Sequence, residues 1–162
     1  MTLQPPLNQT PSTRPIKILG KAVSSSCDNS GVVGGKAPIT GVSVKAVGYL
    51  PAGSTCVGLV SGGPAFEHTR LRYKWLGTKP SGKPMTVARD NTKVAVAVFG
   101  GTSAATYDII SLLQQRGAFP SQTITMHLSI ASDYSEYTAE CFGEGISSVD
   151  FGTDGVSTVS VP

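Results

Sequence analysis

The fold class is decided by residues 93–130, KVAVAVFGGTSAATYDIISLLQQRGAFPSQTITMHLSI. After Lys93, the segment 93–99 (KVAVAVF) has apolar residues on both faces, which is typical of a strand in the interior of a sheet. Residues 122–130 alternate apolar and polar side chains and predict a half-buried strand. Between them, the spacing of apolar residues predicts one helix over 104–115, with Ser103 as its N-cap and Gly117 as its terminator.

Shorter strand signals lie on both sides of this segment, bounded by Gly- and Pro-rich turns. Strands are expected at 16–23, 42–46, 55–60, 70–75 and 136–141. Turns are expected at 24–38 and 78–84, and Asp154-Gly155 indicates a hairpin near the end of the chain. Many short strands without βαβ alternation predict an all-β protein, and a single jelly-roll β-sandwich with one short inserted helix is our first choice.

The chain begins with a polar, Pro-rich stretch, Leu3 to Pro15. Such a segment buries too little apolar surface to offset its ordering entropy, so it is expected to be a flexible arm or to lie on a neighbouring molecule. We therefore divide the 162 residues into an N-terminal arm with a possible edge strand, 1–23, and a β-sandwich shell domain, 24–162.

The composition indicates a protein that is covered by copies of itself. Charged residues make up 14% of the chain, against about 25% in ordinary soluble domains, and Ser and Thr fill the polar positions. The net charge is +3, without the cluster of basic residues that marks a nucleic-acid-binding tail. No apolar run is long enough to span a membrane, and residues 1–10 lack the apolar core of a signal peptide.

The three cysteines, Cys27, Cys56 and Cys141, lie far apart and include no CxxC pair. We expect them mainly as small buried hydrophobic residues in a reducing compartment, with one disulfide as the alternative.

Three cations, Arg70, Arg72 and Lys74, share one face of a strand whose other face carries Leu71, Tyr73 and Trp75. At about 6.6 Å spacing, they could follow a phosphate backbone. The candidate nucleic-acid-binding residues are therefore Arg14, Lys17, Lys21, Arg70, Arg72 and Lys74, with Lys79, Lys83 and Arg89 as reinforcement. The alternative is that the three cations cover sheet surface and pair with Glu140 or Asp133.

Catalytic patterns are weak. His68 and His127 occur without a G-x-S-x-G nucleophile elbow. Glu136 and Glu140 share the polar face of an expected strand, and we interpret them as solvated edge charges. We predict no enzyme activity, no cofactor and no metal site, with Ca²⁺ at a subunit junction as the alternative for the acidic stretch.

The arm (3–15), the strand KVAVAVF (93–99), the helix AATYDIISLLQQ (104–115) and the strand TITMHLSI (123–130) together resemble the coat proteins of small icosahedral RNA viruses, in the manner of bromovirus and tymovirus coats. The likeness is architectural, covers about the central two-thirds of the chain and transfers no site residues. It implies a jelly roll with helical insertions whose copies assemble around a genome. The arm lacks the Arg-rich tract of bromovirus-type coats, which moves the comparison toward the tymovirus type.

These observations predict the structural subunit of a viral capsid that self-assembles from many copies and packages nucleic acid through weak nonspecific contacts, with genomic RNA as the candidate partner. Such a subunit would be assembled in the host cytoplasm and reside in the virion, with no membrane partner. The alternative is a pilus-type or extracellular β-sandwich that polymerises by strand donation. A small enzyme or carbohydrate-binding sandwich is a third reading.

Overall fold

A computed structural model describes residues 1–24, 38–60, 67–101, 106–129, 134–150 and 158–160. The described chain is mostly β, which confirms the all-β class. Its elements are β1 (Thr2–Leu7), β2 (Ile16–Ser24), β3 (Gly41–Leu50), α1 (Cys56–Val60), β4 (Glu67–Thr78), β5 (Pro84–Gly101), β6 (Thr106–Leu113), β7 (Thr123–Ser129), α2 (Tyr134–Phe142), β8 (Ile146–Ser148) and β9 (Thr158–Ser160).

The strands form one antiparallel sheet in the order β8-β1-β2-β3-β4-β5-β6-β7-β9. Strands β1 to β7 are therefore neighbours in chain order, joined as a meander. A jelly roll needs Greek-key connections that bring distant strands together. The jelly-roll order is not confirmed by these strands.

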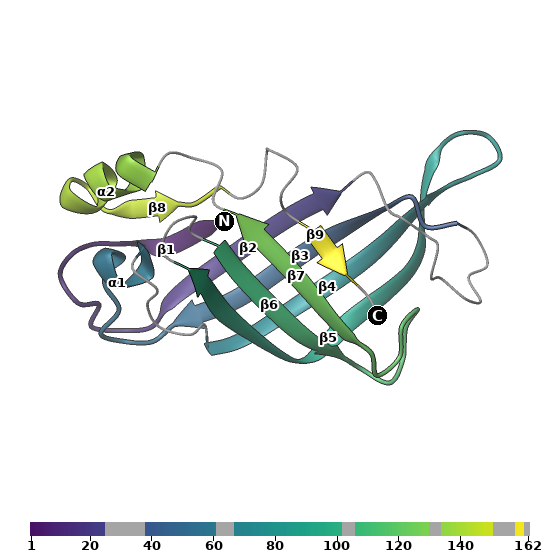
Figure 1. The fold of residues 1–162 in the computed structure, drawn as a ribbon, viewed down its shortest axis with the longest axis horizontal. Helices are drawn as coiled ribbons and strands as arrows, with labels where there is room; N and C mark the ends of the chain where they lie inside the picture. The colour runs from purple at the N-terminus through teal and green to yellow at the C-terminus, as the bar shows by residue number, and fades with distance from the viewer. Residues whose placement is uncertain (25–37, 61–66, 102–105, 130–133, 151–157, 161–162) are drawn as a thin grey trace.

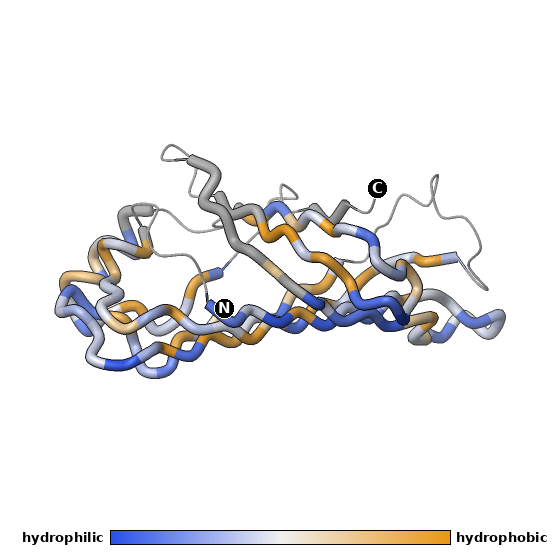
Figure 2. Tube along the Cα trace, turned by 90° about the horizontal axis from the view of Figure 1, so that it is seen from below, coloured by the Kyte–Doolittle hydropathy of each residue, from blue (hydrophilic) through white to orange (hydrophobic). Residues whose placement is uncertain are grey.

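The sheet folds over itself because β5 belongs to two layers (Figures 1 and 2). The first half of this 18-residue strand pairs with β4, and its second half pairs with β6. The register shifts once against β4 and twice against β6, and such bulges bend a strand and increase its twist. As a result, β6 and β7 lie across the inner faces of β3 and β4.

The space between the two layers holds the larger hydrophobic core. It combines side chains of β3 and β4 with those of β6 and β7: Val42, Val44, Leu71, Tyr73, Trp75, Ile109, Leu113, Ile124 and Met126, together with Ile39. The alternation expected in 122–130 is confirmed at Ile124 and Met126, which are buried, and Leu128 is partly buried, while Ile130 lies outside the described residues.

A second core lies at the other end of the sheet, where α1, α2 and β8 cover β1 and β2 (Figure 1). A disulfide between Cys56 of α1 and Cys141 of α2 lies within it. The expectation of unpaired cysteines is therefore wrong for these two, while Cys27 lies outside the described residues. Only the fold brings the two positions together, across 85 residues of sequence.

The helix predicted over 104–115 is wrong, because residues 106–113 form strand β6. Ile109, Ser111 and Leu113 are buried, whereas Ile110 and Leu112 are 44% and 37% exposed, which is a period of two. The prediction failed because apolar side chains occupy both faces of this strand, so their spacing also fits a helix. The pairing of β6 with β5 on one side and β7 on the other decides the conformation.

The opposite error occurs at 136–141, where a strand is expected and helix α2 is found. Tyr137 and Cys141 are both buried while Ala139 is exposed, so the inward residues follow the helical i, i+4 spacing. The strand expected at 55–60 is also wrong: these residues form the short helix α1, in which the Thr55 hydroxyl accepts the backbone N–H of Gly58 at 3.0 Å.

The N-terminal stretch is not a free arm in this structure. Residues Thr2–Leu7 form β1, which lies between β2 and β8, and Leu3 and Leu7 are buried. The remainder of the stretch is held to the turn after β3, where Ser12 and Gly53 form a backbone hydrogen bond of 2.7 Å. Leu3 and Leu7, four residues apart, both reach the core and anchor a segment that otherwise contains polar residues and prolines.

Several other predicted elements are confirmed. The strands expected at 16–23, 42–46 and 70–75 are β2, β3 and β4, and the turn at 78–84 joins β4 to β5. Strand 93–99 is part of β5 and lies inside the sheet. Most of the turn-rich stretch 24–38 and the hairpin expected at Asp154-Gly155 lie outside the described residues.

A buried carboxylate, Asp90 of β5, joins the two layers at one edge of the larger core. It is 1% exposed and accepts hydrogen bonds from the indole N–H of Trp75 at 2.6 Å and from the backbone N–H groups of Ala118 and Phe119 at 3.1 and 3.4 Å. Gly117 must be glycine, because its φ is +150° and a Cβ would collide with the carboxylate. The loop between β6 and β7 is thus fixed to β4 and β5.

Replacing this carboxylate should strongly destabilise the fold. We expect Asp90→Ala to lower the free energy of unfolding by about 3 kcal/mol, because it leaves the buried indole N–H of Trp75 and two partly buried backbone N–H groups unpaired. Asp90→Asn should cost less, since its amide keeps one acceptor oxygen. Urea unfolding followed by Trp fluorescence measures both, with Glu144→Ala, at an exposed carboxylate, as the control. An Asp90→Ala variant as stable as this control would contradict the role given to Asp90.

The stability of the fold should also fall at alkaline pH because of Tyr73. Burial raises the pKa of the Tyr73 hydroxyl and outweighs its hydrogen bond with Ser111, which lowers that pKa. An acid with a raised pKa in the folded state contributes full stability below its unfolded pKa of about 10 and loses it as the pH rises further. Tyr73→Phe should therefore lower the free energy of unfolding by about 1 kcal/mol at pH 8, because the variant lacks the hydrogen bond between Tyr73 and Ser111.

The difference in the free energy of unfolding between the unmutated protein and Tyr73→Phe should shrink above pH 10. Urea unfolding at a series of pH values measures it. Tyr49→Phe, at a partly exposed tyrosine, is the control. A deficit that stays constant up to pH 11 would show that Tyr73 does not titrate with unfolding.

Candidate functional site

The outer face of β2 to β5 carries a cluster of cations. Alternating residues of these strands, such as Ile18, Val44 and Tyr73, are buried in the cores, so the intervening side chains point outward. We define the basic face as the exposed residues Lys17, Lys21, Lys45, Arg70, Arg72, Lys74, Arg89 and Lys93. It holds eight of the 13 Lys and Arg residues of the chain.

Strand register places like charges directly opposite one another on this face. Lys45 is the register partner of Lys21 on one side and of Arg72 on the other, and Lys74 is opposite Arg89. Opposed residues in antiparallel strands have Cβ atoms about 5 Å apart, and like charges at such positions are destabilising. A row of three opposed cations therefore costs stability unless an anion binds over it.

Within the described residues, no carboxylate forms an ion pair with the basic face. Glu67 lies on the same side, opposite Tyr49. It is at the end of the face that holds Lys17 and Arg70, and outside the row of Lys21, Lys45 and Arg72. Glu140 cannot serve as the partner expected in the alternative, because α2 packs through Tyr137 and Cys141 on the other side of the sheet. Asp133 lies outside the described residues. Within the described part of the chain, the row of Lys21, Lys45 and Arg72 therefore has no neutralising carboxylate.

Apolar side chains are exposed among the cations. Val23, Val47 and Tyr49 are 62%, 37% and 36% exposed, and Tyr49 is the register partner of Lys17. A mixture of cations with an accessible aromatic ring suits a ligand that has both phosphates and flat apolar groups.

The structure brings together five of the six predicted residues: Lys17, Lys21, Arg70, Arg72 and Lys74. Arg14 is exposed but precedes β2 and has no partner in the strand register. Lys79 and Lys83 lie in the turn beyond β4, whereas Arg89 joins the basic face opposite Lys74.

Sequence reasoning missed Lys45 and Lys93 as members of the site. The alternation in 42–46 had already placed Lys45 on a polar face, but the register that puts it between Lys21 and Arg72 is a tertiary property. Lys93 continues the face of β5, since its neighbour Thr92 is buried and accepts the backbone N–H of Leu71 at 2.9 Å.

The residues considered for catalysis are not brought together as a site. His68 is exposed at the start of β4 with a φ of +49°, and His127 lies on β7. Glu136 and Glu140 are exposed one helical turn apart on α2. Among the described residues, no group of three or more His, Cys, Asp or Glu side chains could hold a metal ion. No helix within these residues has the length and apolar character needed to cross a membrane.

Comparisons with known proteins found no matching protein-family model, curated protein or solved structure.

The cost of the opposed cations can be measured directly. We expect Lys45→Gln to raise the free energy of unfolding by about 0.5 kcal/mol at low ionic strength, because it removes the charge flanked by Lys21 and Arg72. The gain should diminish in 0.5 M NaCl, where the repulsion is screened. Thermal and urea unfolding of Lys45→Gln beside Lys79→Gln, a cation in the turn, would test this. A destabilised Lys45→Gln variant at low salt would contradict the repulsion.

Proposed function

We propose that this protein is the structural subunit of a viral capsid, which assembles from many copies and holds nucleic acid against its basic face. The observation that carries the proposal is the row Lys21, Lys45 and Arg72, in which opposed cations have no counter-charge within the described residues. A polyanion that lies across the strands would relieve this repulsion, and a nucleic-acid backbone is such a polyanion.

The spacing of the face fits nonspecific binding. Cations two residues apart on a strand are separated by about 6.6 Å, and neighbouring strands lie about 4.8 Å apart, so phosphates can meet cations in several alignments. Contacts of this kind contribute affinity that depends on salt rather than on base sequence. Each subunit then adds a weak attraction that many copies multiply, and RNA is our first choice of ligand.

The remaining surface supports assembly. Besides those on the basic face, exposed apolar residues lie on β6 (Ile110 and Leu112) and on the two helices (Val57 and Phe142). With charged residues at only 14% of the chain, contacts between copies desolvate little charge. The proposed subunit is non-enzymatic, is assembled in the host cytoplasm and resides in the virion. Its shell-forming role does not require the jelly-roll order expected from the resemblance.

One observation favours the alternative of an extracellular β-sandwich that polymerises. The disulfide between Cys56 and Cys141 is of the kind that persists in oxidising compartments. Strand donation by the N-terminal segment is disfavoured, however, because β1 is already paired with β2 and β8 of its own chain.

The two assemblies are distinguished by expressing the chain and analysing it by size-exclusion chromatography, negative-stain electron microscopy and the ratio of absorbance at 260 and 280 nm. Closed particles that carry nucleic acid are expected from the capsid proposal. Filaments without nucleic acid would favour the extracellular alternative, and a monomer that binds no nucleic acid would contradict both.

Removing charge from the basic face should release nucleic acid without unfolding the protein. We expect the triple variant Arg70→Ala, Arg72→Ala, Lys74→Ala to lower the nucleic-acid content of particles and to reduce the slope of log affinity against log salt by about 2 to 3. The matched control is Lys79→Ala, Lys83→Ala, Arg116→Ala, which removes three exposed cations outside the face. Equal losses in both triple variants would show that net charge, and not the basic face, holds the nucleic acid.

A further inference from the structure

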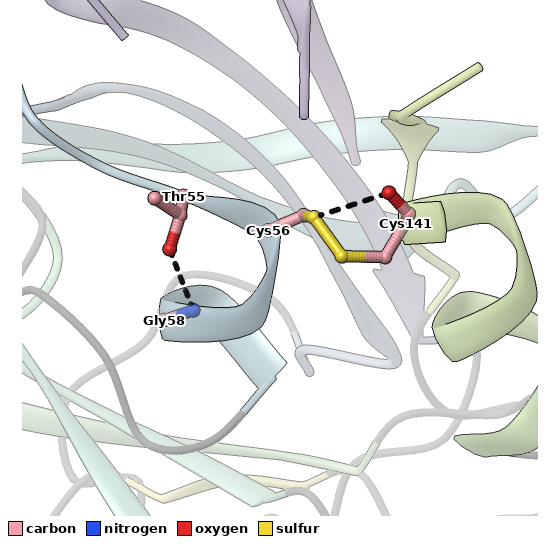
Figure 3. The surroundings of a disulfide bond; sticks show 4 residues. All are labelled: Thr55, Cys56, Gly58 and Cys141. Carbon is pink, nitrogen blue, oxygen red and sulfur yellow. Dashed lines mark hydrogen bonds between the residues drawn. A yellow bond between two sulfur atoms is a disulfide. The ribbon is translucent and has the colours of Figure 1, made fainter. Parts of the chain in front are cut away.

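The disulfide lies where α1 meets α2, at the centre of the smaller core (Figure 3). Its two sulfur-bearing residues, Cys56 and Cys141, are 0% and 3% exposed. Around them pack Leu7 and Ile16 of the sheet and Tyr137 of α2. We call residues 134–150, which comprise α2, β8 and the residues after it, the cap.

Noncovalent contacts already hold the cap and α1 in place. Val149 of the cap donates its N–H to the carbonyl of Met1 at 2.8 Å. Within the cap, the N–H of Asp150 donates to the Tyr137 hydroxyl at 2.9 Å and fixes the residues after β8 to α2. On the other side, the N–H of Cys56 donates to the carbonyl of Asn8 at 2.9 Å. In this arrangement the Cα atoms of Cys56 and Cys141 are 5.6 Å apart, a separation typical of disulfides.

Two thiols would also suit the chemical character of this buried site. Unpaired cysteine behaves as a small hydrophobic residue and is commonly buried. A thiol on Cys56 would have an acceptor, because its Sγ lies 3.6 Å from the carbonyl oxygen of Cys141 (Figure 3). The reduced pair therefore leaves no polar group without a partner at Cys56.

From these contacts we propose that Cys56 and Cys141 form a redox latch. The chain folds with both thiols reduced, and later oxidation locks the cap onto α1. The bond closes a loop of 85 residues, and the restriction of so long a loop in the unfolded chain stabilises the folded state. The latch lets one fold form in a reducing compartment and become more resistant in an oxidising one, whatever the basic face binds.

The oxidant is a low-molecular-weight disulfide such as glutathione disulfide. One cysteine thiolate attacks a glutathione sulfur and forms a mixed disulfide, releasing one glutathione. The second cysteine thiolate then attacks the protein sulfur of the mixed disulfide, releasing the second glutathione. Two protein thiols and one glutathione disulfide thus yield one protein disulfide and two glutathiones. Because both sulfurs are buried, each step requires transient opening of the cap.

The test uses the full chain with Cys27→Ala, which removes the third thiol and leaves the latch intact. The protein is purified under reduction, and half is oxidised with glutathione disulfide. Circular dichroism, alkylation followed by mass spectrometry, melting temperature and hydrogen exchange are compared. We expect the same circular dichroism in both halves, and a melting temperature lower in the reduced half by about 10 °C.

Hydrogen exchange localises the effect. On reduction, exchange should quicken in peptides from the cap and from α1, and remain unchanged in 71–75 of β4, which belongs to the other core. The triple variant Cys27→Ala, Cys56→Ala, Cys141→Ala is the control that should not respond to glutathione disulfide.

Three results would overturn the latch. The reduced protein could lack the fold, which would make the bond a requirement for folding. The reduced and oxidised samples could have the same melting temperature and the same hydrogen-exchange rates, which would mean that the disulfide does not stabilise the cap. Oxidation could yield dimers linked between chains in place of the bond from Cys56 to Cys141.

Discussion

The buried carboxylate of Asp90 is the constraint on which the two-layered structure depends. It lies on β5, accepts the indole N–H of Trp75 on β4, and accepts two backbone N–H groups from the loop that joins β6 to β7. A buried anion is tolerated only when such donors surround it. Because these donors come from both layers, the carboxylate receives all of these hydrogen bonds only if the sheet folds over itself. The edge-to-face contact of Trp75 with Phe119, at 4.8 Å between ring centroids, closes the same corner.

Because the sheet folds over itself, its inner face is apolar and covered, whereas its outer face is charged. The inner faces of β3 and β4 are covered by β6 and β7, and those of β1 and β2 by the helices and β8. The outer face of β2 to β5 has no such cover from the described residues, and it carries eight cations. The same alternation that fills the cores therefore collects the charge on one surface. The proposed binding of nucleic acid uses that surface and leaves the cores intact.

The two ends of the sheet are held by different means. The end near Asp90 relies on hydrogen bonds and aromatic packing, whereas the end near β1 is closed by elements that are far apart in the sequence. There, β8 pairs with β1, and the disulfide joins α1 to α2. A polar N-terminal segment stays in the sheet because Leu3 and Leu7 reach the core. Contacts at this end span most of the chain, and local sequence patterns do not reveal them.

The sequence by itself determined the all-β class and the strands with a clean period of two, such as 70–75 and 123–129, because alternation reflects a sheet with one buried face. It also determined which cations share a face within one strand, as with Arg70 and Arg72. Only the tertiary structure decided the register that sets Lys45 between two cations, and the pairing of Cys56 with Cys141. It also decided the secondary structure of residues 106–113 and 136–141, where the spacing of apolar residues fits both a helix and a strand. In each case the reason is the same: the deciding partners lie on other strands or helices, and periodicity reports only the burial of a segment against whatever covers it.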